Sequence, residues 1–176
     1  TRYSSSAASD VYKRQIKASL QAHESWSTMP WEARAAIFLK ASELLKGEFR
    51  AKINASTMIN QSKTCHQAEI DSACELIDFW RFNVQYAREI YEDLQPPVSP
   101  SSMWNSSEIR PLEGFVFSVT PFNFSSIAAN LPSSAAIMGN TGVWKPSRNS
   151  YLSNYFLMRL MMDCLLYTSP SPRDCQ

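Results

Sequence analysis

The segment "GFVFSVTPFNFSSIAANLPSSAAIMGNTGVWKPS", residues 114–147, decides the fold. Residues 114–119 and 141–145 are short apolar runs typical of buried strands, and residues 124–139 between them are predicted to form a helix. Pro132 predicts a kink or a break within that helix. A further helix is expected over residues 151–163. This order, with short links, predicts a right-handed βαβ unit of a parallel sheet and therefore an α/β fold.

The part of the chain before this segment has a different character. Residues 31–93 carry 18 charged residues in 63, whereas residues 114–163 carry four in 50. The contrast predicts surface-lying helices first and elements buried on both faces later. We expect helices over residues 30–47, 48–60 and 64–93. Apolar residues at helical spacing favour core packing over a cofactor-binding role, namely Trp31, Ala35, Phe38, Leu45, Ala73, Ile77, Trp80, Val84 and Ala87, with Phe79, Phe82 and Tyr86 beside them.

The two ends differ from the middle of the chain. Residues 1–15, "TRYSSSAASDVYKRQ", are rich in serine and show no helix or strand period. Residues 164–176, "CLLYTSPSPRDCQ", follow the last predicted helix without a cap. Both are expected to be translated adaptor sequence fused to a reading frame, and so to lie outside the fold. The chain is therefore divided into an end segment (1–15), a helical region (16–95), a linker rich in proline and serine (96–113), a partial βαβα unit (114–163) and a tail (164–176).

Composition excludes several classes of function. A formal charge of +1 argues against a nucleic acid or an anionic membrane as the main partner. No apolar run approaches the roughly 20 residues that a membrane span needs. The four cysteines have no CxxC spacing, and only two histidines are present, so no metal site is expected. We expect the four cysteines to be reduced, structural thiols, which is consistent with an intracellular protein.

Polar side chains follow each of the two predicted strands. Residues 120–123 come after the first strand and residues 145–147 after the second, and ligands of open parallel sheets gather at such carboxyl ends. The Asn123 amide suits a developing oxyanion, and the Lys145 ammonium suits ribose hydroxyls or phosphate. Two plainer interpretations remain open: Asn123 as the N-cap of the helix and Lys145 as a solvated surface lysine. No GxGxxG is present, so spacing alone does not identify a dinucleotide site.

Several motifs resemble those of a known family. "TPFNF" (120–124), "NLP" (130–132), "MGN" (138–140) and "VWKPS" (143–147) resemble segments of the aldehyde dehydrogenase superfamily. The nearest branch is the Δ1-pyrroline-5-carboxylate dehydrogenases, on account of "PWEARAAIFLKASELL" (30–45) and "TMINQSKTCHQAEIDSACELIDFWRFNVQYA" (57–87). The resemblance runs from residue 26 to residue 163. It implies N-terminal helices followed by the first βαβα part of a Rossmann-like NAD-binding domain, incomplete in this chain.

The resemblance implies catalytic and cofactor roles for four positions. Asn123 matches the asparagine whose amide stabilises the oxyanion of a thiohemiacetal intermediate. Thr120 and Lys145 match positions that contact NAD, the lysine through the adenosine ribose. Ser147 lies beside the lysine and is assigned to the same cofactor site.

Two further positions are implied to face the substrate. Phe124 matches an aromatic residue next to the aldehyde pocket, and Glu75 matches a helix glutamate that approaches the substrate. The pattern alone offers an alternative for Glu75, because Asp71, Glu75 and Asp78 form an acidic stripe of the kind that usually faces water.

The resemblance implies oxidation of L-glutamate γ-semialdehyde to L-glutamate with NAD, a step of proline breakdown, by a homo-oligomer in the mitochondrial matrix or the bacterial cytoplasm. The family's nucleophilic cysteine and its glutamate base lie beyond residue 163, so this chain alone is predicted to be inactive. Two alternatives stay open. The first is an aldehyde dehydrogenase of different substrate range, and the second is a truncated, non-enzymatic binding module.

Overall fold

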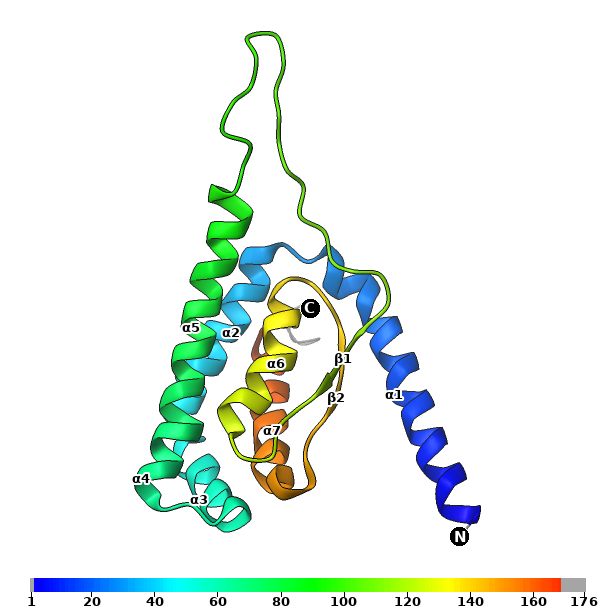
Figure 1. The fold of residues 1–176 in the computed structure, drawn as a ribbon, viewed down its shortest axis with the longest axis vertical. Coiled ribbons are helices and arrows are strands. Elements are labelled where there is room, and N and C mark those ends of the chain that lie inside the picture. The colour runs from blue at the N-terminus through cyan, green and yellow to red at the C-terminus, as the bar shows by residue number, and fades with distance from the viewer. Residues whose placement is uncertain (1, 169–176) are drawn as a thin grey trace, which may run out of the picture.

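The computed structural model describes residues 2–168, with side chains from residue 10 to residue 165. The first half of the fold is helical (Figure 1). It consists of α1 (Arg2–Thr28), α2 (Trp31–Lys46), α3 (Arg50–Gln61) and one continuous helical run made of α4 (Cys65–Ala68), the π-helical η1 (Glu69–Cys74), α5 (Glu75–Arg88) and the π-helical η2 (Glu89–Asp93).

The second half contains the parallel sheet predicted from the sequence. Strand β1 (Val116–Val119) is followed by α6 (Ser125–Ile137), β2 (Gly142–Lys145), a 3-10 turn η3 (Arg148–Ser150) and α7 (Tyr151–Thr168). The strands pair in parallel, with Val116 opposite Gly142 and Val119 opposite Lys145. The two strands therefore end level with each other, and the Thr120 amide donates to the Lys145 carbonyl at 3.2 Å.

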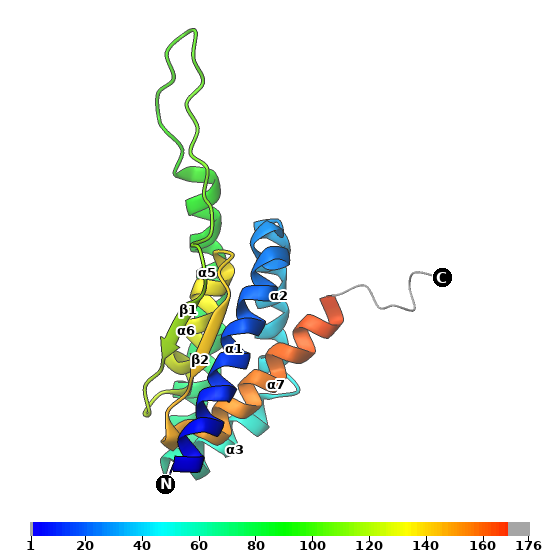
Figure 2. The ribbon, with the colours of Figure 1, turned by 90° about the vertical axis from the view of Figure 1, so that its right-hand side faces the viewer.

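The core lies where α2, α5, α6 and α7 meet, with α2 packed against both α5 and α7 (Figures 1 and 2). Its largest fully buried side chains include Trp80, Phe38, Leu45 and Leu157. Burying a side chain of this size stabilises a fold by about 1.5 to 3 kcal/mol. Most of the predicted apolar residues of the helices α2 and α5 are confirmed as core. Trp31 and Phe79 are only partly buried, and Phe82 and Tyr86 are exposed and stack on each other.

A buried arginine joins the ends of three elements. Arg34 is 3% exposed, and its guanidinium donates to the carbonyls of Ile137 and Met29 and to the hydroxyl of Tyr91. Gly139 follows α6 at φ +87°, where a Cβ atom would lie 2.6 Å from the Pro111 side chain and 3.2 Å from Arg34 Cζ. The turn between α6 and β2 therefore depends on a glycine at this position.

The structure corrects the prediction for residues 1–15. Residues 2–15 are helical and form the first half of α1 rather than an irregular end. The side chains of residues 10–15 are all exposed, so this stretch buries no face and its sequence carries no apolar period. Farther along, α1 is attached to the fold, since Trp26 Nε1 donates to the Ala136 carbonyl at 3.0 Å. Whether residues 1–15 are adaptor sequence stays a prediction.

Two boundary predictions in the second half are also wrong. The last helix continues past residue 163 to Thr168, and the rest of the predicted tail, residues 169–176, lies outside the described residues. A kink at Pro132 stays a prediction, but the alternative of a break is wrong, because α6 is continuous around this residue. We attribute this to tertiary packing, because α6 is held between α5 and the two strands.

Burial of the strands on both faces is found only in part. Ser118 and Val143 are buried, whereas Phe117 and Val119 are 55% and 56% exposed. Among the described residues, no element covers these two side chains.

Between η2 and β1 the chain forms a long projecting connector (Figures 1 and 2). No described helix is long and apolar enough to cross a membrane.

Candidate functional site at the strand ends

The fold brings the predicted site residues to one edge of the sheet. Thr120, Asn123 and Phe124 lie between β1 and α6, while Lys145 is the last residue of β2 and Ser147 lies two residues after it. The register of the strands places both segments at the same carboxyl edge. Thr120 is bonded twice to the end of β2, because its amide donates to the Lys145 carbonyl and its hydroxyl accepts from Trp144 Nε1 at 3.0 Å.

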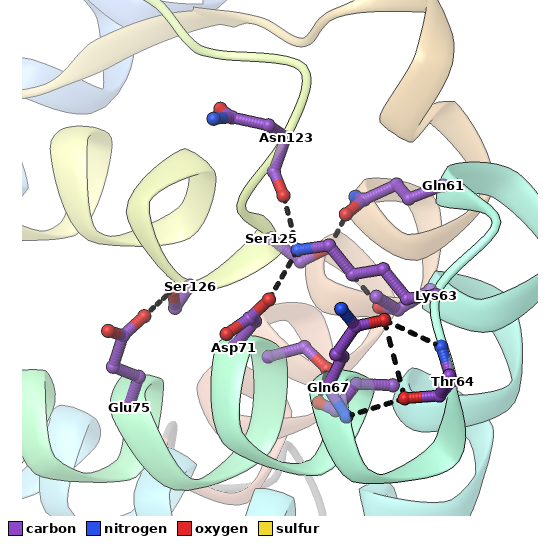
Figure 3. Close-up of polar contacts among 12 residues, drawn as sticks. Gln61, Lys63, Thr64, Gln67, Asp71, Glu75, Asn123, Ser125 and Ser126 are labelled. Atoms are coloured by element: carbon purple, nitrogen blue, oxygen red, sulfur yellow. Dashed lines mark hydrogen bonds and ion pairs between the residues drawn. The ribbon is translucent and has the colours of Figure 1, made fainter.

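Asn123 does not cap α6, so that interpretation is wrong. The N-cap residue is Phe124, and no side chain makes a capping hydrogen bond there. The Asn123 side chain is exposed and points away from the neighbouring polar cluster, while its carbonyl points into it (Figure 3). Within the described part of the chain, the Asn123 amide makes no hydrogen bond. It is therefore available to a ligand.

Lys63 contacts the backbone that carries Asn123. Its Nζ lies 2.6 Å from Asp71 Oδ2, donates to the Asn123 carbonyl, and lies 4.3 Å from the centroid of the Phe124 ring (Figure 3). The side chains of Lys63 and Asp71 are 14% and 19% exposed. An ammonium that is shielded from water to this degree interacts more strongly with its partners than a surface lysine does.

Ser125, at the start of α6, is the centre of a buried hydroxyl network. Its Oγ accepts from Gln61 Nε2 at 2.9 Å and donates to Ser153 Oγ at 2.9 Å, and it lies 3.2 Å from Thr57 Oγ1. These partners belong to α3 and α7. The first turn of α6 is therefore fixed from two other helices.

Glu75 reaches the same segment from α5. Its carboxylate accepts a hydrogen bond from Ser126 Oγ at 2.6 Å (Figure 3). The alternative of a uniformly solvated acidic stripe is wrong for two of its three members, because Asp71 pairs with Lys63 and Glu75 is only partly exposed. Asp78 alone is exposed. Contact of Glu75 with a substrate stays a prediction.

Lys145 and Ser147 are held differently from Asn123. The Lys145 side chain is exposed and makes no hydrogen bond or ion pair with any described residue. The Ser147 carbonyl accepts from the Ser150 amide at 3.2 Å, but its hydroxyl is not used. Both interpretations of Lys145, as a solvated lysine and as a ligand for ribose, fit this exposure, so its cofactor role stays a prediction, as do those of Thr120 and Ser147.

The described cysteines are poor candidates for a nucleophile. Burial, reinforced by a hydrogen bond to Glu69, raises the pKa of the Cys74 thiol, and burial raises the pKa of Cys164 to about 11. A thiol with a raised pKa is protonated at neutral pH and reacts slowly. Cys65 is exposed and is the first residue of α4, in agreement with its predicted place on a helix. Cys175 lies outside the described residues.

An apolar cavity of about 520 Å³ lies elsewhere, between α1, α6, α7 and β2. Its walls include Trp26, Ala136, Val143 and Met158, and none of the predicted site residues lines it. Over the described residues, no group of three or more His, Cys, Asp or Glu side chains could hold a metal ion.

Sequence reasoning missed the residues that hold the Asn123 segment. Lys63 and Gln61 are distant from Asn123 in sequence, and nothing in their local pattern identifies their partners. One local feature was available. Thr64 and Gln67 form a capping box that starts α4 directly after Lys63, and the spacing T-x-x-Q is visible in the sequence. It predicts where the turn ends, and not what the turn contacts.

Comparisons with known proteins agree with this architecture. A family profile described as "Aldehyde dehydrogenase family" matches residues 2–167. The chain is 51% identical over 144 residues to the Δ1-pyrroline-5-carboxylate dehydrogenase of Agaricus bisporus, covering 82% of this chain and 26% of that protein. It is 45% identical over 157 residues to the mitochondrial human enzyme of that name, covering 89% of this chain and 28% of that protein.

The structural comparison confirms the expected incomplete α/β fold. The crystal structure of the Mycobacterium tuberculosis Δ-pyrroline-5-carboxylate dehydrogenase bound with NAD superposes with a TM-score of 0.83 at 51% identity. The match covers 85% of this chain and 28% of that one, so the chain spans about a quarter of the length of these relatives. The strand-end motifs and the parallel βαβ unit agree with the family match over residues 2–167. The chain therefore belongs to the aldehyde dehydrogenase family.

Proposed function

We propose that this chain is the N-terminal part of an NAD-dependent dehydrogenase that oxidises L-glutamate γ-semialdehyde to L-glutamate in proline catabolism. The observation that carries the proposal is at the carboxyl ends of the paired strands, where the side chains of Asn123 and Lys145 are exposed and neither makes a hydrogen bond with a described residue. The relatives named Δ1-pyrroline-5-carboxylate dehydrogenase, at 45% to 51% identity, support the choice of substrate.

Asn123 is assigned to the oxyanion that develops when a thiolate adds to the aldehyde carbon. Its amide can donate to that oxygen without first losing another partner. Phe124 and Glu75 are assigned to the substrate side of the same segment. The Glu75 carboxylate is already oriented by Ser126, which suits it to contact a polar group of the substrate.

Thr120, Lys145 and Ser147 are assigned to the cofactor. Lys145 suits a dinucleotide, since its exposed ammonium offers three donors and makes no hydrogen bond or ion pair with a described residue, whereas Thr120 is 6% exposed. NAD, when bound, supplies the hydride acceptor. The chain's own part is to orient the ribose and phosphates against the sheet edge.

The 176-residue chain by itself is proposed not to turn over substrate. The two thiols with raised pKa, Cys74 and Cys164, are poorly suited to attack an aldehyde, and Cys65 sits in a helix without the family's motif around it. NAD reduction by the purified chain with glutamate semialdehyde would contradict this. The exposed apolar side chains of β1, Phe117 and Val119, oppose the alternative of a free-standing binding module.

A eukaryotic source would place the complete protein in the mitochondrial matrix, because the relatives from Dictyostelium discoideum and Homo sapiens are named mitochondrial. A bacterial source would place it in the cytoplasm. The complete protein is proposed to be a homo-oligomer with a small-molecule aldehyde as its partner.

The test is made on the complete protein that contains this chain. We expect NADH formation with glutamate semialdehyde at higher kcat/KM than with simple aliphatic aldehydes. Asn123→Ala should lower kcat by about 100- to 1000-fold, because one oxyanion donor is lost. Asn105→Ala removes a similar amide from the exposed connector and should leave kcat unchanged. Equal activity of the two variants would overturn the role of Asn123, and a preference for other aldehydes would favour a different substrate range.

A further inference from the structure

We propose that Lys63 is a positioning residue that orients Asn123 for the reaction, an inference that rests on the proposed function. Lys63 lies in the turn between α3 and α4 and so belongs to neither strand end. Its ammonium nevertheless contacts two consecutive residues of the Asn123 segment, namely the carbonyl of Asn123 and the ring of Phe124.

The turn is built to direct this side chain toward α6. Ser62, immediately before Lys63, has φ +53° and is the one described non-glycine residue in the left-handed region. This conformation ends α3, and the capping box of Thr64 and Gln67 starts α4 two residues later. The short reversal between two fixed helix ends leaves Lys63 facing the segment that precedes α6 (Figure 3).

The contacts of Lys63 use its whole ammonium group. Asp71 Oδ2 at 2.6 Å balances the charge, the Asn123 carbonyl accepts a second hydrogen bond, and the Phe124 ring lies 4.3 Å away at its centroid. At 14% exposure, little of the side chain remains for solvent. The ion pair with Asp71 therefore holds the Lys63 ammonium against the peptide group between Asn123 and Phe124.

Fixing that peptide group fixes the direction of the Asn123 side chain. The carbonyl of Asn123 faces Lys63, and its exposed amide side chain projects away from Lys63 (Figure 3). An oxyanion donor acts only when it is held in place, and a displacement of about 1 Å can lower a rate by about 100-fold. Lys63 touches no reacting atom in this scheme and acts through Asn123.

The test compares variants of the complete protein. Lys63→Met keeps the aliphatic stem and removes the charge and its donors. We expect kcat to fall by about 10- to 100-fold while KM for NAD stays constant. Lys63→Arg keeps a cation at the position and should recover most of that loss. The matched control is Lys52→Met on α3, which removes an exposed ammonium that lies 5.0 Å from the centroid of the Phe49 ring and makes no hydrogen bond to the Asn123 segment.

The double variant separates positioning from general loss of structure. If Lys63 acts through Asn123, Lys63→Met combined with Asn123→Ala should be no slower than Asn123→Ala alone. Multiplied effects in the double variant, or a kcat of Lys63→Met equal to that of Lys52→Met, would overturn the inference.

A spectroscopic readout distinguishes this inference from the proposed function. Isotope labelling of asparagine carbonyls and phenylalanine amides isolates the Asn123–Phe124 peptide group, whose carbonyl resonance should shift in Lys63→Met and not in Lys52→Met. If Asn123→Ala keeps full activity, the proposed function fails, and the resonance alone then decides whether Lys63 orients this segment. An unshifted resonance overturns the orientation by Lys63 in either case.

Discussion

The two strand ends of this chain are held in different ways, although they lie side by side. The segment after β1, residues 123–126, is tied by side chains from α3, α5, α7 and the turn at Lys63. Residues 145–147, at the end of β2, are held through the carbonyls of Lys145 and Ser147, and the side chains of these two residues make no hydrogen bond with a described residue. A group that stabilises a transition state gains from rigidity, whereas a group that binds a mobile cofactor can adjust to it.

The largest expected effect comes from removing the hydrogen bonds of Ser125, which hold residues 123–126, the tied end. Ser125→Ala leaves Gln61, Thr57 and Ser153 with a lost partner in a buried site, which costs about 2 to 3 kcal/mol. Hydrogen exchange in the peptide covering the first turn of α6 should accelerate by about 30- to 150-fold in the complete protein. Ser134→Ala, on the same helix, removes only a local bond to the Leu131 carbonyl and should change exchange by about twofold or less. Equal acceleration in both variants would contradict the tied end.

An intermediate effect is expected at the untied end. Lys145→Met should raise KM for NAD by about tenfold and leave kcat nearly constant, because it removes a charged donor used in binding. Unfolding and exchange should not change, since Lys145 has no partner among the described residues. Steady-state kinetics with varied NAD checks this, with Arg159→Met on the exposed side of α7 as the control. A fall in kcat at constant KM would mean that Lys145 serves the chemistry instead.

The smallest effect concerns acidification of the tied end. The hydrogen bond from Arg50, and then that from Asn54, hold the pKa of Glu69 below its ordinary value near 4.5 and link α3 to η1. A lowered pKa contributes stability that is present above the ordinary value and is lost as pH falls through the folded value. Exchange at the first turn of α6, corrected for its intrinsic rate, should therefore accelerate below about pH 4.5.

Glu69→Gln should remove that acid response and accelerate exchange at neutral pH by up to about fivefold, because the pair is partly exposed to solvent. The control is Glu43→Gln. The pKa of Glu43 is also lowered, chiefly by a hydrogen bond from Arg81, but this exposed pair makes no hydrogen bond to residues 123–126. An acid response that persists in Glu69→Gln would show that another carboxylate controls this segment.

Much of this comparison could be predicted from the sequence, and part of it could not. The positions of β1, α6 and β2 follow from apolar runs and their lengths, and the two polar segments follow from the rule for parallel strands. The sequence did not predict that Asn123 is free and its carbonyl bound, because Lys63 lies 60 residues away along the chain. It also favoured irregular structure over the first half of α1, since residues 10–15 are exposed and carry no apolar period.

The sequence by itself determined the order of the elements after α1, the parallel pairing and the residues presented at the sheet edge, because those depend on local periodicity and on the chirality of βαβ connections. Only the tertiary structure decided which of those residues is held and which is left free. That choice depends on contacts such as Lys63 with Asn123 and Gln61 with Ser125, which join distant parts of the chain. Such contacts become visible only when the helices have packed, since nothing in the neighbouring residues encodes their partners.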